Sequence, residues 1–153
     1  MPKEASQSGS ATAGWETRRL ALSRSRRALV IFPLMYEKVN LSEKLRLLDR
    51  PYQPGIVGRL NDYKLMVVKL KGPFVWHKHD DTDDFFLVLR GCVTIQLRDG
   101  HVELREGEMF VVPRGVEHCP NAEEEAYVLL IEPAGTLNTG DAGGELTAEE
   151  HEI

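Results

Sequence analysis

The chain of 153 residues contains only two cysteines, Cys92 and Cys119. Two thiols are too few for the disulfide framework of a small secreted scaffold, so reduced thiols in a cytoplasmic protein are expected. Long apolar runs are also missing. The longest, at residues 28–35, is interrupted by Pro33 and is well short of the roughly 20 residues that cross a bilayer. The sequence therefore predicts no membrane partner.

An excess of basic charge is lacking as well, because the formal net charge is −5. Nucleic-acid binding depends on a basic face that displaces counterions from phosphates, so no nucleic-acid partner is expected. The sequence contains no P-loop, no dinucleotide fingerprint, no Gly-x-Ser-x-Gly elbow and no zinc-finger cysteine spacing. These absences exclude several large classes of enzyme and binding protein.

Charge divides the chain into unlike parts. Residues 1–34 carry six basic and two acidic side chains, whereas the remainder carries 13 basic and 22 acidic. The small, polar composition of the first part predicts a disordered basic extension. Two alternatives stay open: an over-extended start, with the functional protein beginning at Met35, or a targeting segment. The expected folded domain covers residues 35–135. An acidic C-terminal arm at residues 136–153, with a brief helix considered at residues 147–151, completes the chain.

One short helix followed by many strands is the predicted architecture. Leucines at helical spacing after Asn40, a plausible N-cap, indicate a helix within residues 39–49. From Pro54 onward, short runs rich in Val, Ile, Leu and Phe are separated by turn signals such as Asp99-Gly100. Eight or nine such strands, one of them at FVWHKH, predict an all-β sandwich or barrel. The segment Gly55–Leu60 should form an exposed edge strand, which would otherwise invite aggregation.

The candidate site consists of histidines and a carboxylate at the ends of these strands. His77 and His79 share one face of an extended segment, and Asp84 follows across an acidic loop. His118 follows a tight turn. Three imidazoles and one carboxylate can then meet inside a barrel and bind a divalent transition metal: Fe, Mn, Ni, Zn or Cu. Two alternatives remain: a solvated hairpin loop without metal, and Asp83 in place of Asp84 if the strand register slips by one residue.

These segments resemble the two motifs of the cupin superfamily, in particular small single-domain cupins without a settled activity. The matching residues of the first motif are Gly72, His77, His79, Asp84 and Gly91, and those of the second are Gly107, Pro113, Gly115 and His118. Cupins usually have Glu at the position of Asp84, and the Asn that closes the second motif is replaced by Ala122. The resemblance covers about residues 57–133. It implies a double-stranded β-helix, a jelly-roll-like barrel, with a metal held by the residues named above. Because small cupins often pair through exposed strands, it also implies a homodimer formed through the edge at Gly55–Leu60.

Two functions follow from this reading. The first is a metal-dependent enzyme, of oxygenase or isomerase type, acting on a small metabolite. The second is a non-catalytic barrel that binds or senses a sugar or another small ligand. Phe86 and Val88 share the parity of Asp84, so they should form an apolar wall beside the metal.

The remaining candidates are expected to have no catalytic role. His101 and His151 should be solvated. Cys119 should face away from His118, and Cys92 is interpreted as a small core residue.

Overall fold

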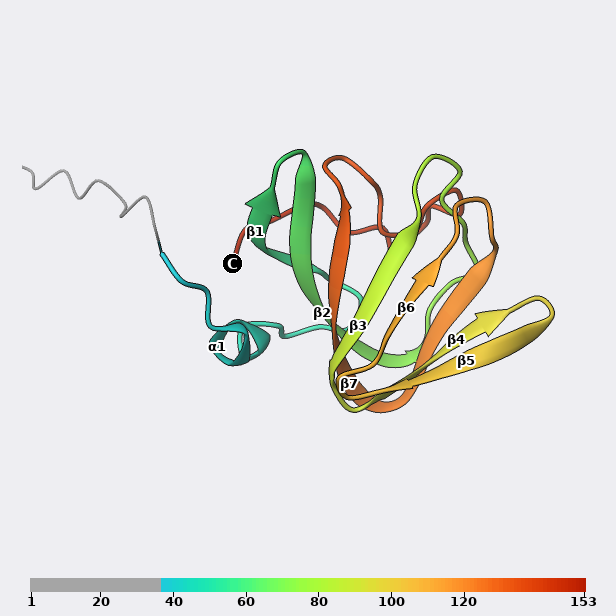
Figure 1. Ribbon diagram of the computed structural model, residues 1–153, viewed down its shortest axis with the longest axis horizontal. Coiled ribbons are helices and arrows are strands. Elements are labelled where there is room, and N and C mark those ends of the chain that lie inside the picture. Colours follow the sequence, from blue (N-terminus) through green and yellow to red (C-terminus); the bar gives the residue numbers. More distant parts are fainter. Residues whose placement is uncertain (1–36) are drawn as a thin grey trace, which may run out of the picture. The chain divides into compact units, whose positions relative to one another are not determined.

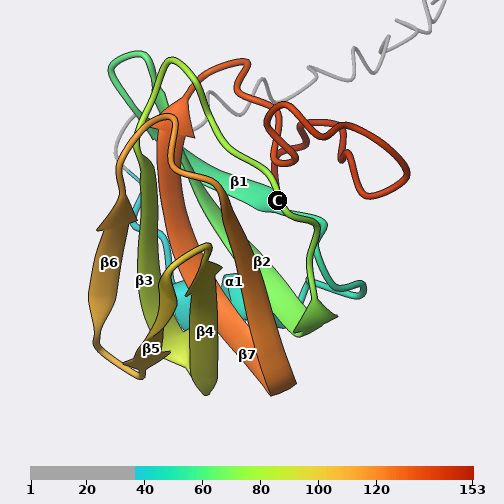
Figure 2. The ribbon, with the colours of Figure 1, turned by 90° about the vertical axis from the view of Figure 1, so that its right-hand side faces the viewer.

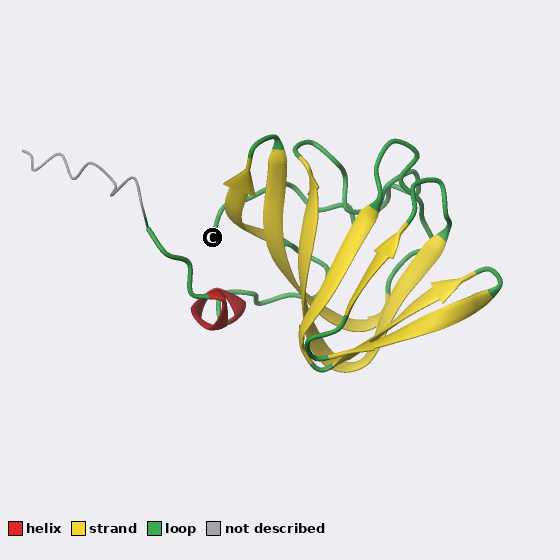
Figure 3. Ribbon diagram, viewed as in Figure 1, coloured by secondary structure: helices red, strands yellow, loops and turns green. Residues whose placement is uncertain are grey.

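The computed structural model describes residues 37–153, and the extension predicted at residues 1–34 lies outside them. The described part contains one helix and a seven-stranded antiparallel sheet that curves into a barrel (Figures 1 and 3). The all-β prediction is therefore confirmed. In chain order the elements are α1 (Leu41–Leu45), β1 (Gly55–Leu60), β2 (Tyr63–Pro73), β3 (Asp84–Arg90), β4 (Cys92–Leu97), β5 (Gly100–Arg105), β6 (Met109–Val112) and β7 (His118–Pro133).

The long strand β7 connects the two parts of the barrel. The main strand order is β1-β2-β7-β3-β6, and β4 pairs with both β5 and β7. Residues 118–121 of β7 pair with β4, whereas residues 127–131 pair with both β2 and β3. Figure 2 shows β7 crossing from the side of β4 to its place between β2 and β3. Because one strand belongs to both parts, the start of β7 faces the barrel interior near the start of β3.

Alternating side chains fill the interior with apolar groups. In β3 the buried positions are Asp84, Phe86 and Val88, as the period of two along a strand requires. They pack with residues such as Met66 of β2 and Val128 of β7 in one core. Each large apolar side chain buried in this way contributes about 1.5–3 kcal/mol to folding. Asp84 is therefore a carboxylate at the end of an otherwise apolar inner face.

The helix is shorter than predicted. It covers five residues, Leu41–Leu45, and buries none of them. The backbone carbonyl of Asn40 accepts from the N–H groups of Glu43 and Lys44, but the Asn40 side chain caps no backbone group. Within residues 37–153, no helix is long and apolar enough to cross a membrane.

The strand predicted at FVWHKH is absent. After β2 ends, this segment forms an isolated bridge between His77 and His118, and Phe74 N donates to the carbonyl of Pro120 at 2.8 Å. The backbone of Lys78 bonds elsewhere: its N–H donates to Asp141 Oδ1 at 2.9 Å, and its carbonyl accepts from Asp141 N at 3.1 Å. The C-terminal residues thus take the place of a strand partner.

The chain after Pro133 lies against the barrel and contains no helix at residues 147–151. Its end covers part of the edge of β1. Ile56 donates its N–H to the carbonyl of His151 and accepts from the N–H of Ile153. Edge pairing at Ile56 is therefore already taken by the same chain, and the homodimer stays a prediction.

Gly91 offers a test of a close backbone contact within the barrel. Its φ is +87°, and a Cβ there would lie 3.0 Å from Ala126 Cβ and 3.1 Å from the carbonyl oxygen of Glu125. We expect Gly91→Ala to lower the free energy of unfolding by about 1–3 kcal/mol. Gly100 has no atom within 4 Å of an added Cβ, so Gly100→Ala should leave it nearly unchanged. Urea unfolding followed by circular dichroism compares the two, and equal effects would contradict the contact.

Candidate metal centre

Three histidines and an aspartate are buried together inside the barrel. The exposed fractions are 2% for His77, 6% for His79, 4% for Asp84 and 1% for His118. The backbone positions two of them directly. His77 N donates to His118 O at 3.0 Å, and His118 N donates to His77 O at 2.9 Å. This bridge holds the two rings side by side, with centroids 4.3 Å apart.

The distances between nitrogen and oxygen atoms suit a shared cation. Ligand atoms of His77, His79 and Asp84 all lie within 4.8 Å of one another. Asp84 Oδ2 lies 3.1 Å from His118 Nε2 and 3.7 Å from His79 Nε2. Two atoms that each lie about 2.1 Å from one ion, at angles from a right angle to trigonal, are roughly 3.0–3.6 Å apart. His118 is not part of the group within 4.8 Å, but it joins the cluster through its contact with Asp84. The structure thus buries all four predicted residues side by side, and their ligation of a metal stays a prediction.

Backbone carbonyls orient two of the imidazoles. Nδ1 of His77 lies 3.0 Å from the carbonyl oxygen of Val75, and Nδ1 of His118 lies 3.0 Å from that of Val116. A carbonyl oxygen can only accept, so Nδ1 carries the proton in both rings. In this tautomer Nε2 carries a lone pair, as a metal ligand requires, and Nε2 of His118 faces Asp84 Oδ2 at 3.1 Å.

Two polar atoms at the centre have no hydrogen-bond partner among residues 37–153. They are His79 Nε2 and Asp84 Oδ1, both fully buried. An unsatisfied buried polar group costs about 1–3 kcal/mol, and a divalent cation bound among the side chains would satisfy both atoms. The imidazole and carboxylate donors also suit such an ion. The residues present therefore fit a transition metal.

Burial keeps the imidazoles in the form that binds metals. Burial, reinforced by the neighbouring His118, lowers the pKa of His77 to about 4. Burial also lowers the pKa of His79, although the Asp84 carboxylate opposes this shift. Both rings are consequently neutral near pH 7, with a lone pair available for a metal.

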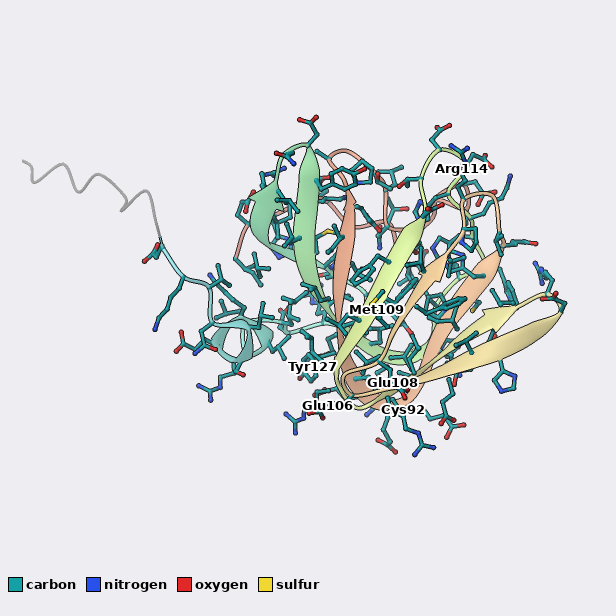
Figure 4. All side chains as sticks on the ribbon, in the orientation of Figure 1. Cys92, Glu106, Glu108, Met109, Arg114 and Tyr127 are labelled. Atoms are coloured by element: carbon teal, nitrogen blue, oxygen red, sulfur yellow. The ribbon has the colours of Figure 1, made fainter. Side chains whose placement is uncertain are left out.

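The strand register decides between Asp83 and Asp84. Asp84 is buried in the site, whereas Asp83 is exposed. Asp83 Oδ1 accepts from the backbone N–H of Arg114 at 2.9 Å and so ties the two loops of the motifs together at the barrel rim, where Figure 4 labels Arg114. Asp83 therefore joins the two loops, and Asp84 is the carboxylate of the site.

The other candidates lie away from the site, with one correction. His101 and His151 are exposed, as expected. Cys119 is buried, its thiol donates to the carbonyl of Phe74, and burial raises its pKa, so it is no nucleophile. The expectation of a core position for Cys92 is wrong. Cys92 is exposed, because the alternation along β4 turns Val93 inward instead, and Figure 4 shows Cys92 beside Glu106 at the end of the barrel.

A small cavity adjoins the histidines. Its volume is about 40 Å³. Apolar side chains form most of its wall, including Phe86, as predicted, and Leu130. Polar groups reach it from His77, Asp84, Glu132 and Asn138.

Sequence reasoning missed Glu132 and its partner Lys64. Each is 2% exposed, and Lys64 Nζ lies 3.4 Å from Glu132 Oε2. Burial, and next the nearby Asp84, raises the pKa of Glu132 to about 8, while Lys64 opposes the shift. The sequence could have indicated Glu132 through the alternation of inward and outward side chains along a strand, because Glu132 lies two residues after the inward-facing Leu130.

Metal binding is the direct test of this centre. We expect the purified protein to bind about one equivalent of Co(II). His118→Gln and Asp84→Asn should each weaken Co(II) affinity at least about tenfold, because each removes a donor atom or its charge. Equilibrium dialysis with elemental analysis measures the affinity. The matched control is His101→Gln at an exposed position, and equal losses in all three variants would contradict the assignment.

Comparisons with known proteins give three findings. A family model described as a cupin domain matches residues 64–132, from β2 to the end of β7. The crystal structure of a cupin-2 domain containing protein from Shewanella frigidimarina is 43% identical, with a TM-score of 0.61, and the match covers 62% of this chain and 93% of that one. A hydroquinone 1,2-dioxygenase from Sphingomonas sp. TTNP3 is 19% identical, with a TM-score of 0.51 over 66% of this chain and 82% of that one. The last likeness shows the fold alone.

The chain is also similar to curated dioxygenases. The 3-hydroxyanthranilate 3,4-dioxygenase of Jannaschia sp. is 34% identical over 112 residues, which are 69% of this chain and 61% of that enzyme. The chain thus matches only about 60% of that enzyme's length.

Proposed function

Because the chain belongs to the cupin family, we propose that His77, His79, Asp84 and His118 hold one divalent transition metal in an enzyme of the oxygenase type that acts on a small metabolite. One observation carries the proposal. Three imidazoles and a carboxylate converge beside an apolar cavity, and His79 Nε2 and Asp84 Oδ1 have no partner within residues 37–153. The similarity to curated dioxygenases favours oxygenase over isomerase chemistry.

The donor set narrows the choice of metal. Four protein ligands leave open positions on a five- or six-coordinate ion, which favours Fe(II), Mn or Ni over tetrahedral Zn. Such an ion supplies Lewis-acid polarisation and, in the case of iron, redox chemistry with dioxygen.

The chain's own residues prepare the site. The carbonyls behind His77 and His118 fix their rings, so little reorganisation is needed when a metal binds. Apolar side chains, Phe86 among them, form most of the cavity wall. Asn138 also lines the cavity, and its side-chain oxygen Oδ1 accepts a hydrogen bond from the N–H of Ala148 at 2.9 Å.

The size of the cavity favours a second candidate function, a non-catalytic barrel that binds or senses a small ligand. A volume of about 40 Å³ accommodates on the order of three water molecules. A metabolite with an aromatic ring would need more room than this volume provides.

Oxygen consumption separates the two functions. We expect protein loaded with Fe(II) without air to consume dioxygen when 3-hydroxyanthranilate or a related small aminophenol or catechol is added. An oxygen electrode and chromatography of the substrate measure the reaction, and His118→Gln should abolish it because the ion is lost. His101→Gln is the matched control. A metal-loaded protein that binds these compounds but consumes none of them, with or without air, would establish the binding function instead.

A further inference from the structure

Arg98 contacts both chain segments that carry the clustered histidines. It follows β4, whose last residue, Leu97, pairs with His118 of β7, and it belongs to the turn that leads into β5. Its Cζ atom lies 3.9 Å from the ring centroid of Trp76. Its guanidinium group also donates two hydrogen bonds to Glu117, at 2.8 and 2.7 Å. One exposed side chain thus joins three segments of the barrel.

Each partner of Arg98 immediately precedes a histidine of the candidate metal centre. Trp76 precedes His77, and Glu117 precedes His118. Neighbouring residues of an extended chain point to opposite sides, and the burial follows this rule. His77 and His118 are buried, whereas Trp76 and Glu117 stay partly exposed. The two segments are therefore joined twice, by the backbone bridge between the histidines and by Arg98 on the outer side.

The geometry of the Arg98 contacts is more specific than that of most surface ion pairs. Nε donates to one carboxylate oxygen of Glu117 and Nη2 to the other, which fixes the orientation of both groups. The indole of Trp76 is the aromatic ring that attracts a cation most strongly. Arg105 offers a comparison, because it also donates twice to one glutamate, Glu103. Both residues of that pair belong to β5, so the pair does not join separate segments.

We propose, building on the metal site proposed above, that Arg98 is a positioning residue. It acts through Trp76 and Glu117 to keep His77 and His118 in the arrangement that binds the metal. The segment that carries His77 lies between β2 and β3 rather than within a strand, so contacts from other parts of the chain hold it. A metal binds the molecules in which the histidines are already arranged, and its apparent affinity falls with the population of that form. Loss of the Arg98 contacts lowers this population.

Hydrogen exchange of the metal-free, full-length protein tests the positioning without any metal. The amide N–H groups of His77 and His118 form the backbone bridge, and local opening of the bridge exposes them to exchange. We expect Arg98→Gln to speed the exchange of both amides about threefold to tenfold, as measured by NMR. Arg105→Gln is the matched control and should leave both rates unchanged. Unchanged rates in Arg98→Gln, or an equal acceleration at amides throughout β2 and β7, would overturn the inference.

Cobalt affinity is the second measurement, and its sign separates positioning from charge. The loss of a positive charge by itself favours the binding of a cation. We expect Arg98→Gln instead to weaken Co(II) affinity about threefold to tenfold. Trp76→Leu, which changes no charge, should weaken the affinity likewise. Arg98→Lys keeps the charge and a donor group, so it should bind Co(II) more tightly than Arg98→Gln does.

Equilibrium dialysis measures these affinities, again with Arg105→Gln as the control that should match the wild type. An Arg98→Gln variant that binds Co(II) as tightly as the wild type, or more tightly, would overturn the inference and leave the metal site intact. Failure of the wild type to bind Co(II) would overturn the proposed function itself. Hydrogen exchange would still decide in that case whether Arg98 holds the two histidine segments together.

Discussion

The backbone bridge between His77 and His118 is the contact on which the site depends. The segment that carries His77 and His79 has left the sheet, and it is held by this bridge on one side and by Asp141 on the other. The two reciprocal hydrogen bonds of the bridge are continued by one from Gly115 N to the carbonyl of His79 at 2.7 Å. In an ordinary surface loop, such backbone N–H and carbonyl groups would hydrogen-bond to water. Here these groups are paired with the strand that carries His118. The imidazole cluster therefore depends on β7 being in place.

Charge explains why the barrel tolerates so many polar groups inside. Asp84 and Glu132 are carboxyls, Lys64 is the cation beside them, and all three are almost fully buried. A buried carboxylate without a compensating charge costs several kcal/mol. Lys64 is already bonded to Glu150, so the interior lacks positive charge. A divalent ion at the histidines would supply it next to Asp84, and neutral imidazoles add no competing charge.

Much of the fold and of the site could be predicted from the sequence, since both rest on local rules. Alternation turns Asp84, Phe86 and Val88 to one side of β3, and a turn of two residues joins β4 to β5. What was missed depends on tertiary pairing. FVWHKH has the composition of a strand, but Asp141, more than sixty residues away in the chain, takes the hydrogen bonds of Lys78. Lys64 and Glu132 look like ordinary charged residues near strand ends, and only the pairing of β2 with β7 places both inside.

The C-terminal residues contact the site, although they lie outside the two sequence motifs that contain its proposed ligands. Gly140 lies so close to the backbone of Lys78 that an added Cβ would meet its carbonyl oxygen and approach the ring of His77. Lys64 binds Thr136 and Glu150 of the same region and also faces Glu132. The C-terminal segment and the carboxyl that borders the cavity therefore share one ammonium group.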